Sequence, residues 1–497
     1  MKLTDYSIAD CYDELFQSAG EARNSCSPLV EHLRALDVCE LTQYQQAADL
    51  FLRNSGITFN VYGHADGTER VWPFDVVPRI IGSTEWSKIE SGLKQRIDAL
   101  NCFVQDVYND ARILTEGVVP EHLIFSSKSY REQCRGLQPP HSTWCHITGS
   151  DVVRDANGDL YVLEDNLRCP SGVSYVLTNR DLMKRVFTTI FRGMSIAPVE
   201  EYPDNLLRTL TDCAPAAVEN PTVVLLTPGV FNAAYFEHTY LAQQMGIELV
   251  EGSDLVVDGG YVCMKTTSGL RRVDVIYRRI DDDFLDPKCF RSDSALGVDH
   301  LMDVYRAGNV NIANAPGVGI ADDKAIYPYV PDIIRFYLGE EAIIKNVPTF
   351  SCAVDKEKNH VLANLNNLVV KPTNESGGYG ILMGPMSTQQ QRDECAASIH
   401  QNPREWIAQP MLNLSTAPTL VNGSLQPRHV DLRPFILRGK DTYVMKGGLT
   451  RVALVEGSMI VNSSQGGGSK DTWVLADHDC VPQASVQHAT FPEAPPC

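Results

Sequence analysis

The feature that most constrains this chain is the order in which two polar motifs occur along it. Glu164–Asn166 stands in the first half, at the end of an apolar run with the pattern of a strand. Lys371 stands in the second half, again after an apolar run, and leads into the glycine-containing segment 374–380. Carboxylate and amide oxygens suit magnesium, whereas a lysine and glycine backbone suit phosphate. The motifs predict two halves of one ATP site, which the fold has to bring together.

Composition and charge narrow the class of protein. The 497 residues are too many for one hydrophobic core, and 43% hydrophobic with 21% charged residues is typical of a folded protein. The net charge of −19 argues against nucleic acid or an anionic membrane as the main partner. The 14 cysteines show no CxxC pair, and the first residues form no apolar run. We therefore expect reduced cysteines, no signal peptide, no membrane span and a cytoplasmic location.

Periodicity divides the chain into five expected segments. Apolar positions at helical spacing predict a helical start and a long helix from Trp86 to about Asp106. From about 221 the pattern becomes strand, glycine loop and helix, which is typical of a doubly wound α/β unit. The predicted segments are a helical region (1–70), the segment with the metal-binding strand end (71–220), the α/β unit (221–320), a nucleotide-binding region (321–475) and a loose tail (476–497).

The first motif ends a predicted β-hairpin over 151–163, whose turn contains Asn157 and Gly158. Glu164 and Asn166 are two residues apart, so they face the same side of the strand. Asp151 begins the partner strand and can lie across from them. A polar strand end beside a turn is the alternative. The predicted magnesium ligands are Asp151, Glu164 and Asn166.

The second motif predicts a phosphate site. Glycines let backbone N–H groups approach phosphate oxygens, while Lys371 neutralises their charge. The segment is not a Walker loop, because GxxxxGK[ST] is missing, and a β-turn with a solvated lysine stays open. The predicted contacts are Lys371, Gly377, Gly378 and Gly380.

Two further sites carry candidate cations. Lys324 precedes a helix expected from Ala325 and is placed to reach another phosphate, although a solvated lysine is the alternative. Asp431 and Arg433 share one face of a strand. A fixed guanidinium can hold a γ-phosphate or a developing oxyanion. An ion pair between these two residues is the structural alternative.

A glycine-rich loop at 461–471 completes the candidate nucleotide contacts. Apolar strands flank it closely, and a glycine loop between strands permits close approach of a ligand. A flexible linker is the alternative. Gln409, at a strand end, is expected beside the adenine. The residues assigned to this group are Gln409, Asn462, Ser463, Gly466 and Gly467.

The remaining motifs exclude more than they assign. No Gly-x-Ser-x-Gly or His-Glu-x-x-His signature stands out, and the histidines are isolated from one another. The acidic run 281–283 beside Arg278 and Arg279 predicts either an amine-binding surface or a salt-bridged loop, with the loop favoured.

With these residues placed, the chain resembles the circularly permuted ATP-grasp family over roughly residues 70–475. In an unpermuted ATP-grasp enzyme the lysines and the Asp-x-Arg strand come first and the carboxylate strand comes last. Here the carboxylate strand has moved ahead of the α/β unit. Glutathionylspermidine synthetase is similar in this respect, but its cysteine amidase has no counterpart here. The matching segments are 163–168, 170–175, 273–287, 321–324, 431–435 and 462–468.

The resemblance implies an α/β (α+β) fold in which two antiparallel-sheet subdomains grasp ATP beside a pre-ATP-grasp domain at 221–320. It implies an ATP-dependent carboxylate–amine ligase that forms an amide or peptide bond through an acylphosphate with Mg-ATP. Lys324 and Lys371 would bind the α- and β-phosphates and Asp431 would belong to the nucleotide site. Arg433 and Lys371 would be catalytic, and the magnesium ligands would be those predicted above.

The substrates stay open at this point. A small-molecule or peptide acid and amine are expected, and a homo-oligomer or a partner protein is an open alternative to a lone chain. The competing hypothesis is an ATP-binding scaffold without turnover. The presence of both lysines, the carboxylate strand and Arg433 favours the ligase.

Overall fold

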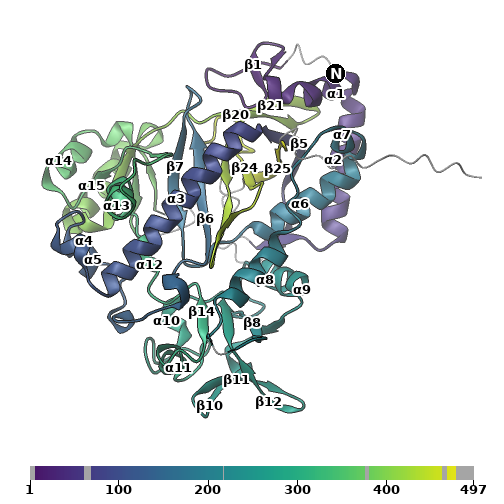
Figure 1. Cartoon of the computed structure of the whole chain (residues 1–497). Helices are drawn as coiled ribbons and strands as arrows, with labels where there is room; N and C mark the ends of the chain where they lie inside the picture. The colour runs from purple at the N-terminus through teal and green to yellow at the C-terminus, as the bar shows by residue number, and fades with distance from the viewer. Residues whose placement is uncertain are drawn as a thin grey trace, which may run out of the picture.

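The computed structural model describes residues 6–60, 69–216, 218–374, 380–459, 461 and 467–476. Figure 1 shows a large central sheet crossed by the long helix α3 (Ser83–Tyr108), a smaller sheet with its own helices at the left, and a parallel sheet below. The mixed α/β fold class is the one expected. The limits of the five segments stay a prediction.

The large sheet combines strands from both halves of the chain. Its order is β15-β7-β6-β21-β24-β25-β5, with β20 beside β21 and the β22–β23 hairpin beside β6. The early hairpin β6–β7 thus lies next to the late strands β21 and β22, as one ATP site requires. The strands are β5 (Phe74–Ile81), β6 (Ile147–Arg154), β7 (Leu160–Asn166), β15 (Lys345–Asn346), β20 (Thr416–Val421), β21 (Ser424–Arg433), β22 (Phe435–Arg438), β23 (Thr442–Val444), β24 (Leu449–Val452) and β25 (Gly468–Val474).

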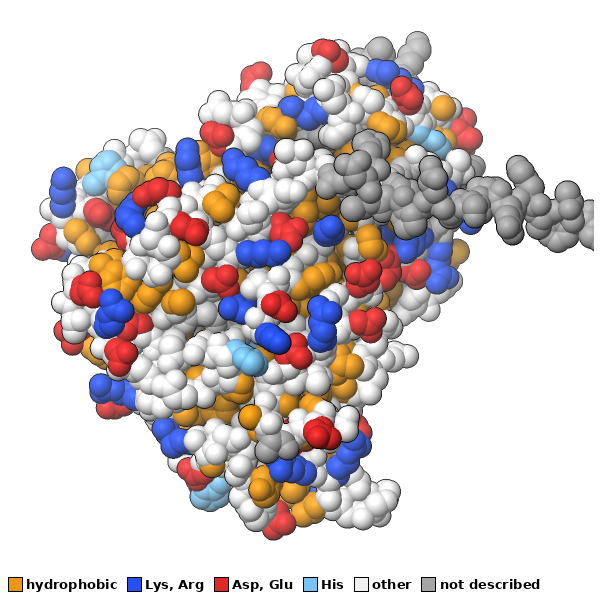
Figure 2. Space-filling view, viewed as in Figure 1, with side chains coloured by type: hydrophobic (Ala, Val, Ile, Leu, Met, Phe, Trp, Pro, Cys, Tyr) orange, Lys and Arg blue, Asp and Glu red, His pale blue; other side chains and the backbone are white. Residues whose placement is uncertain are grey.

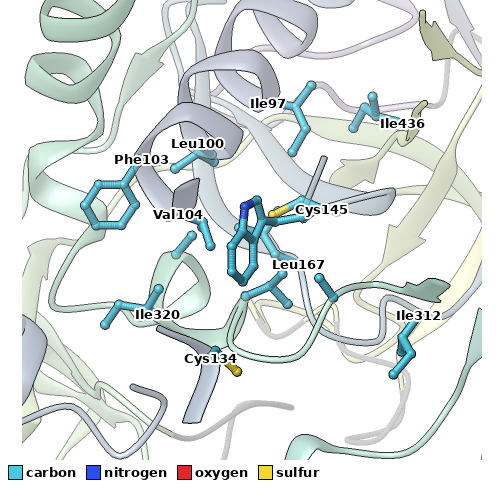
Figure 3. Close-up of a cluster of buried hydrophobic side chains, with 14 of the residues drawn as sticks. Ile97, Leu100, Phe103, Val104, Cys134, Cys145, Leu167, Ile312, Ile320 and Ile436 are labelled. Carbon is cyan, nitrogen blue, oxygen red and sulfur yellow. The ribbon is translucent and has the colours of Figure 1, made fainter. Parts of the chain in front are cut away.

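Apolar cores cover both faces of this sheet. Ile436 belongs to the cluster that contains the apolar face of α3, whereas Phe435 and Leu437 belong to a second cluster with residues of α6 (Val173–Val186). Consecutive residues of a strand point to opposite faces, so the two clusters lie on opposite sides. Figure 3 shows the first cluster, where Leu100 and Val104 of α3 gather near Leu167.

The parallel sheet has the order β14-β13-β8-β9. The chain runs from β8 outward to β9 and then returns to β13 and β14 on the other side of β8, which makes the β8–β13 boundary a topological switch point. Its strands are β8 (Val223–Leu226), β9 (Glu248–Val250), β13 (Val275–Arg278) and β14 (Asn311–Ala313), and α8 (Tyr202–Asp212) and α9 (Tyr235–Met245) accompany them. A three-stranded sheet extends below it in Figure 1: β10 (Leu255–Asp258), β11 (Tyr261–Thr266) and β12 (Gly269–Val273).

The small sheet has the order β16-β19-β17-β18 and a separate hydrophobic core. The helix expected from Ala325 begins later than predicted. A 3-10 turn occupies Tyr327–Tyr329, and α13 (Val330–Leu338) starts behind it with a proline in its first turn, where the missing N–H costs nothing. The remaining elements are β16 (Phe350–Ser351), β17 (Leu368–Pro372), β18 (Leu382–Met383), β19 (Trp406–Pro410), α14 (Asp355–Ala363) and α15 (Gln389–Gln401).

The first segment is only partly helical. One short hairpin precedes its two α-helices and another follows them. Glu14 ties the segment to the large sheet because the buried carboxylate accepts from Arg79, Arg154 and Ser415. The elements are β1 (Phe16–Ser18), β2 (Glu21–Ala22), α1 (Ser27–Ala35), α2 (Val38–Asn54), β3 (Thr58–Asn60) and β4 (Glu69–Val71). The other short helices are α4 (Arg112–Thr115), α5 (Glu121–Phe125), α7 (Thr188–Gly193), α10 (Asp282–Leu285), α11 (Leu301–Arg306) and α12 (Gly319–Asp322).

The surface and the cysteines agree with the composition. On the face in Figure 2, acidic and basic side chains are interspersed among apolar ones, so the net charge of −19 is not concentrated in one patch of the described surface there. The 12 cysteines among the described residues are free thiols. In the part of the chain that the structure describes, no helix is both long and apolar enough to span a membrane.

The packing of α3 yields a stability prediction. A Cβ on Gly92 would lie 2.5 Å from Ile344 Cγ1, so Gly92→Ala should destabilise the fold by about 1–3 kcal/mol through overpacking. Gly193 ends α7 with nothing within 4 Å of the same position, so Gly193→Ala serves as the matched control. Urea unfolding measures both variants, and equal effects would contradict the packing assigned to Gly92.

Candidate functional site

The predicted magnesium ligands lie on one face of the large sheet. Asp151 stands opposite Glu164, whereas Val152 stands opposite Val162, so the register skips Leu163. This irregularity turns Glu164 to the face of Asp151, and a bulge that re-aims a side chain in this way is common beside active sites. Asn166 shares that face and its Nδ2 donates to the Gly149 carbonyl at 3.1 Å, which leaves the amide Oδ1 to bind a cation.

Asp165 points the other way, toward α3. Its two carboxylate oxygens accept from Arg96 Nε at 2.9 and 2.8 Å, and Oδ1 also accepts from Ser150 Oγ at 2.8 Å. The buried bidentate pair fixes the strand between the two candidate ligands on either side. Asp165 is therefore a structural anchor of the predicted metal site.

Asp151 is the centre of a buried array of charges. Its carboxylate accepts from Arg433 Nε at 2.5 Å and from Arg451 Nη2 at 2.6 Å. Arg451 Nε also donates to Asp431 Oδ1 at 3.0 Å from the opposite strand. Burial alone would raise the pKa of Asp151, but the two guanidinium groups outweigh it and hold that pKa below its ordinary value.

Asp431 and Arg433 do not form the ion pair with each other that was the structural alternative. Arg433 pairs with Asp151 on β6, and Asp431 pairs with Arg451 on β24. Burial raises the pKa of Asp431 despite the opposing charge of Arg451. Sequence reasoning missed Arg451, whose signal was a charged residue within the otherwise uncharged strand β24.

The lysines approach from the side of the small sheet. Lys371 on β17 donates to Gln409 Oε1 on β19 at 2.7 Å, and Gln409 Nε2 donates to Thr349 Oγ1 at 2.9 Å. Lys324 Nζ lies 3.4 Å from Glu164 Oε2, so an ion pair joins the lysine to the strand of the predicted metal ligands. Burial lowers the pKa of Lys371 to about 8, with Lys324 adding to the effect and Glu164 opposing it.

The structure thus brings together the residues predicted for the metal, both lysines and the arginine, although they come from separate parts of the sequence. Gly380 (φ 72°) and the buried Gly467 lie at the ends of the described segments. The other predicted loop contacts lie outside the described residues: Gly377, Gly378, Asn462, Ser463 and Gly466. Gln409 lies against Lys371, and its role toward adenine stays a prediction.

The acidic run is engaged in ion pairs. Asp282 is buried and lies 2.7 Å from Arg278, while Asp283 lies 2.8 Å from Arg131. These pairs agree with the salt-bridged loop that the sequence favoured over an amine-binding surface.

Comparison with known families decides the fold family. The model of circularly permuted ATP-grasp type 2 proteins matches residues 78–453. The chain belongs to the circularly permuted ATP-grasp family. A glutathione synthetase-like effector of Globodera pallida shares the fold with a TM-score of 0.57 at 12% identity, covering 88% of this chain and 97% of that one.

Relatives of this circularly permuted ATP-grasp chain include an uncharacterized protein of Synechocystis that is 55% identical over 476 residues, 96% of this chain and 99% of the relative. An uncharacterized protein of Mycobacterium tuberculosis is 49% identical over 476 residues, which are 95% of this chain and 86% of the relative. A Frankia casuarinae protein provisionally named glutamate–cysteine ligase 2-2 is 40% identical over 93% of this chain, which spans only 53% of that relative. Membership in the ATP-grasp family supports an ATP-dependent ligase in general.

The buried lysine yields a pH prediction. With a folded pKa of about 8 against an unperturbed 10.5, the charged form of Lys371 is disfavoured in the fold. The penalty is present below pH 8 and disappears as the pH rises toward 10.5, so the wild type should gain about 3 kcal/mol of stability across that window relative to Lys371→Met. Urea unfolding at several pH values measures this difference.

A second buried lysine provides the control. Lys470 pairs with Asp75 and donates to two backbone carbonyls, so Lys470→Met should destabilise by about 3–5 kcal/mol because Asp75 loses its partner. A loss of this size in Lys371→Met, or a pH-dependent gain in stability that persists in that variant, would contradict the account of Lys371.

Proposed function

We propose that this protein is an ATP-dependent carboxylate–amine ligase that works through an acylphosphate with Mg²⁺. The observation that carries the proposal is the contact of 3.4 Å between Lys324 and Glu164. The contact joins a lysine that we assign to phosphate binding with a carboxylate that we assign to metal binding. Arg433 is close to the same residues, because it pairs with Asp151, which stands opposite Glu164. A triphosphate with its metal needs this combination of charges in one place.

The donor set fits magnesium. Glu164 and Asn166 present hard oxygen ligands on one face, and the amide of Asn166 is already oriented by Gly149. Asp151 would join them, with Arg433 and Arg451 beside it balancing the charge of the phosphates. A magnesium ion bound there would neutralise phosphate oxygens and orient the triphosphate.

The chain's own residues have distinct tasks in this proposal. Lys324 and Lys371 would bind the α- and β-phosphates, and Gln409 holds the Lys371 ammonium in place. Arg433 would stabilise the charge of the γ-phosphoryl group as it leaves ADP. Its Nε and Nη2 are both held by Asp151, so the guanidinium plane is fixed before the nucleotide binds.

The chemistry requires no protein nucleophile. A substrate carboxylate oxygen attacks the γ-phosphorus, the bond to the bridging oxygen breaks, and ADP leaves. The amine nitrogen then attacks the acyl carbon, inorganic phosphate leaves with the acyl oxygen, and the amine gives up a proton. The name of the Frankia relative is consistent with ligation, but that protein is about twice the matched length, so glutamate and cysteine are two candidates among several substrates.

The competing proposal is an ATP-binding scaffold without turnover. It would need a nucleotide site but no group aimed at a transferred phosphoryl. The guanidinium of Arg433, held by the buried Asp151, favours the ligase because a scaffold has no need to pre-orient it.

Removal of two candidate ligands tests the metal site. Glu164→Ala with Asn166→Ala should weaken binding of Mg·ATP by about 10–100-fold, measured by calorimetry with a non-hydrolysable analogue. Asp159→Ala, at the exposed turn of the same hairpin, should leave the affinity unchanged. Unchanged affinity in the double variant would remove the proposed magnesium site.

A panel of acids and amines tests turnover. ADP release should depend on one class of carboxylic acid, and phosphate and amide should form in equal amounts when the matching amine is present. Binding of Mg·ATP without ADP release under any pair of substrates would favour the scaffold.

A further inference from the structure

The loop 167–174 connects the strand of the predicted metal ligands to α6. It begins directly after Asn166 and ends in the first turn of the helix. Several of its backbone N–H and C=O groups are held by side chains from the α/β unit and from α12, which follow it by many residues in the sequence. The side chains that hold it are Glu237, Arg279, Asn314 and Asp322.

The first half of the loop is held by an amide and a carboxylate. Asp322 Oδ2 accepts from the N–H groups of Leu167 at 2.9 Å and Arg168 at 3.1 Å. Asn314 Nδ2 donates to the carbonyls of the same two residues at 2.5 and 3.2 Å. Asn314 Nδ2 also donates to the Ile147 carbonyl at 2.6 Å, so one amide joins the end of β7 to the start of β6.

The second half is held by a buried ion pair. Arg279 donates to the Pro170 carbonyl at 2.7 Å and to Ser171 Oγ at 2.5 Å. Glu237 accepts from the N–H of Gly172 at 2.7 Å and from the N–H of Ser174 at 3.1 Å, where α6 begins. The Glu237 and Arg279 side chains lie 3.0 Å apart and are each 1% exposed, so neither is available to a substrate.

The loop touches the site at both ends. Asn166 precedes it, and Arg433 Nη1 donates to the Ser171 carbonyl at 3.4 Å. Arg279 and Asn314 follow β13 and β14 at the carboxyl edge of the parallel sheet, the edge at which open α/β sheets place their ligands. This loop thus connects the α/β unit to the candidate ligand Asn166 and to Arg433, the arginine proposed to bind the γ-phosphoryl group.

We propose that Glu237 and Arg279 are positioning residues that fix the loop 167–174, and through it the directions of Asn166 and Arg433. The consequence for turnover rests on the proposed ligase function, whereas the fixed loop does not. Apolar side chains in place of this buried ion pair would also hold α9 against α6, often with equal or greater stability. A carboxylate and a guanidinium instead fix individual backbone N–H and C=O groups in direction, which a positioned site needs.

The test uses the full-length protein with Glu237→Gln and a matched control. Gln keeps the size of the side chain but loses the charge that pairs with Arg279. The control is Arg180→Lys, which disturbs an equally buried pair with Asp471 farther along α6. Hydrogen exchange of peptides covering 167–175, thermal unfolding, and steady-state kinetics with Mg·ATP are measured for both.

We expect faster exchange over 167–175 in Glu237→Gln and unchanged exchange there in Arg180→Lys, even if both lose thermal stability. Turnover should fall about 10–100-fold in Glu237→Gln, with the KM for ATP within about threefold of the wild type, because Lys371 is held by Gln409 and Lys324 pairs with Glu164, which precedes this loop. Unchanged exchange over 167–175 in Glu237→Gln, or equal changes in both variants, would overturn the proposal. A wild type that never releases ADP would refute the ligase instead, while the exchange measurement would still decide the role of Glu237.

Discussion

The site depends on the buried carboxylate of Asp151. Only 1% of this residue is exposed, and a carboxylate so far from water is tolerated only with charged partners. Both partners, Arg433 and Arg451, come from the late half of the chain, while Asp151 belongs to the early hairpin. This requirement for opposite charge favours a sheet in which β6 lies beside β21 and β24 lies on the far side of β21. The same arrangement brings together site residues that stand in permuted order along the chain.

Much of the fold could be predicted from local patterns. The hairpin over 151–163, the strand before Lys371 and the helix around Leu93 are each determined by periodicity and turn residues within a short stretch. The start of α13 and the short hairpins of the first segment were not predicted. A proline sets the start of α13, and contacts with distant strands stabilise the short hairpins. Neither effect produces a periodic pattern of apolar residues in the sequence.

The residues of the candidate site likewise fall into those that local sequence patterns predicted and those that depend on distant contacts. Glu164, Asn166 and Lys371 could be proposed from their positions at strand ends, and the structure places them near one another. Their partners could not be proposed, because an ion pair such as Arg451 with Asp151 joins residues far apart in the sequence. Glu237 escaped notice for the same reason: a lone glutamate on a helix is usually solvated, and only the packing of α9 against the start of α6 buries it.

The central claim is that one nucleotide contacts both sheets. Hydrogen exchange with and without a non-hydrolysable ATP analogue and Mg²⁺ tests it directly. The account predicts added protection both at the ends of β6 and β7 and in β17 and β19, and loss of that protection when Mg²⁺ is removed. Protection confined to one of the two sheets, or independent of the metal, would contradict it.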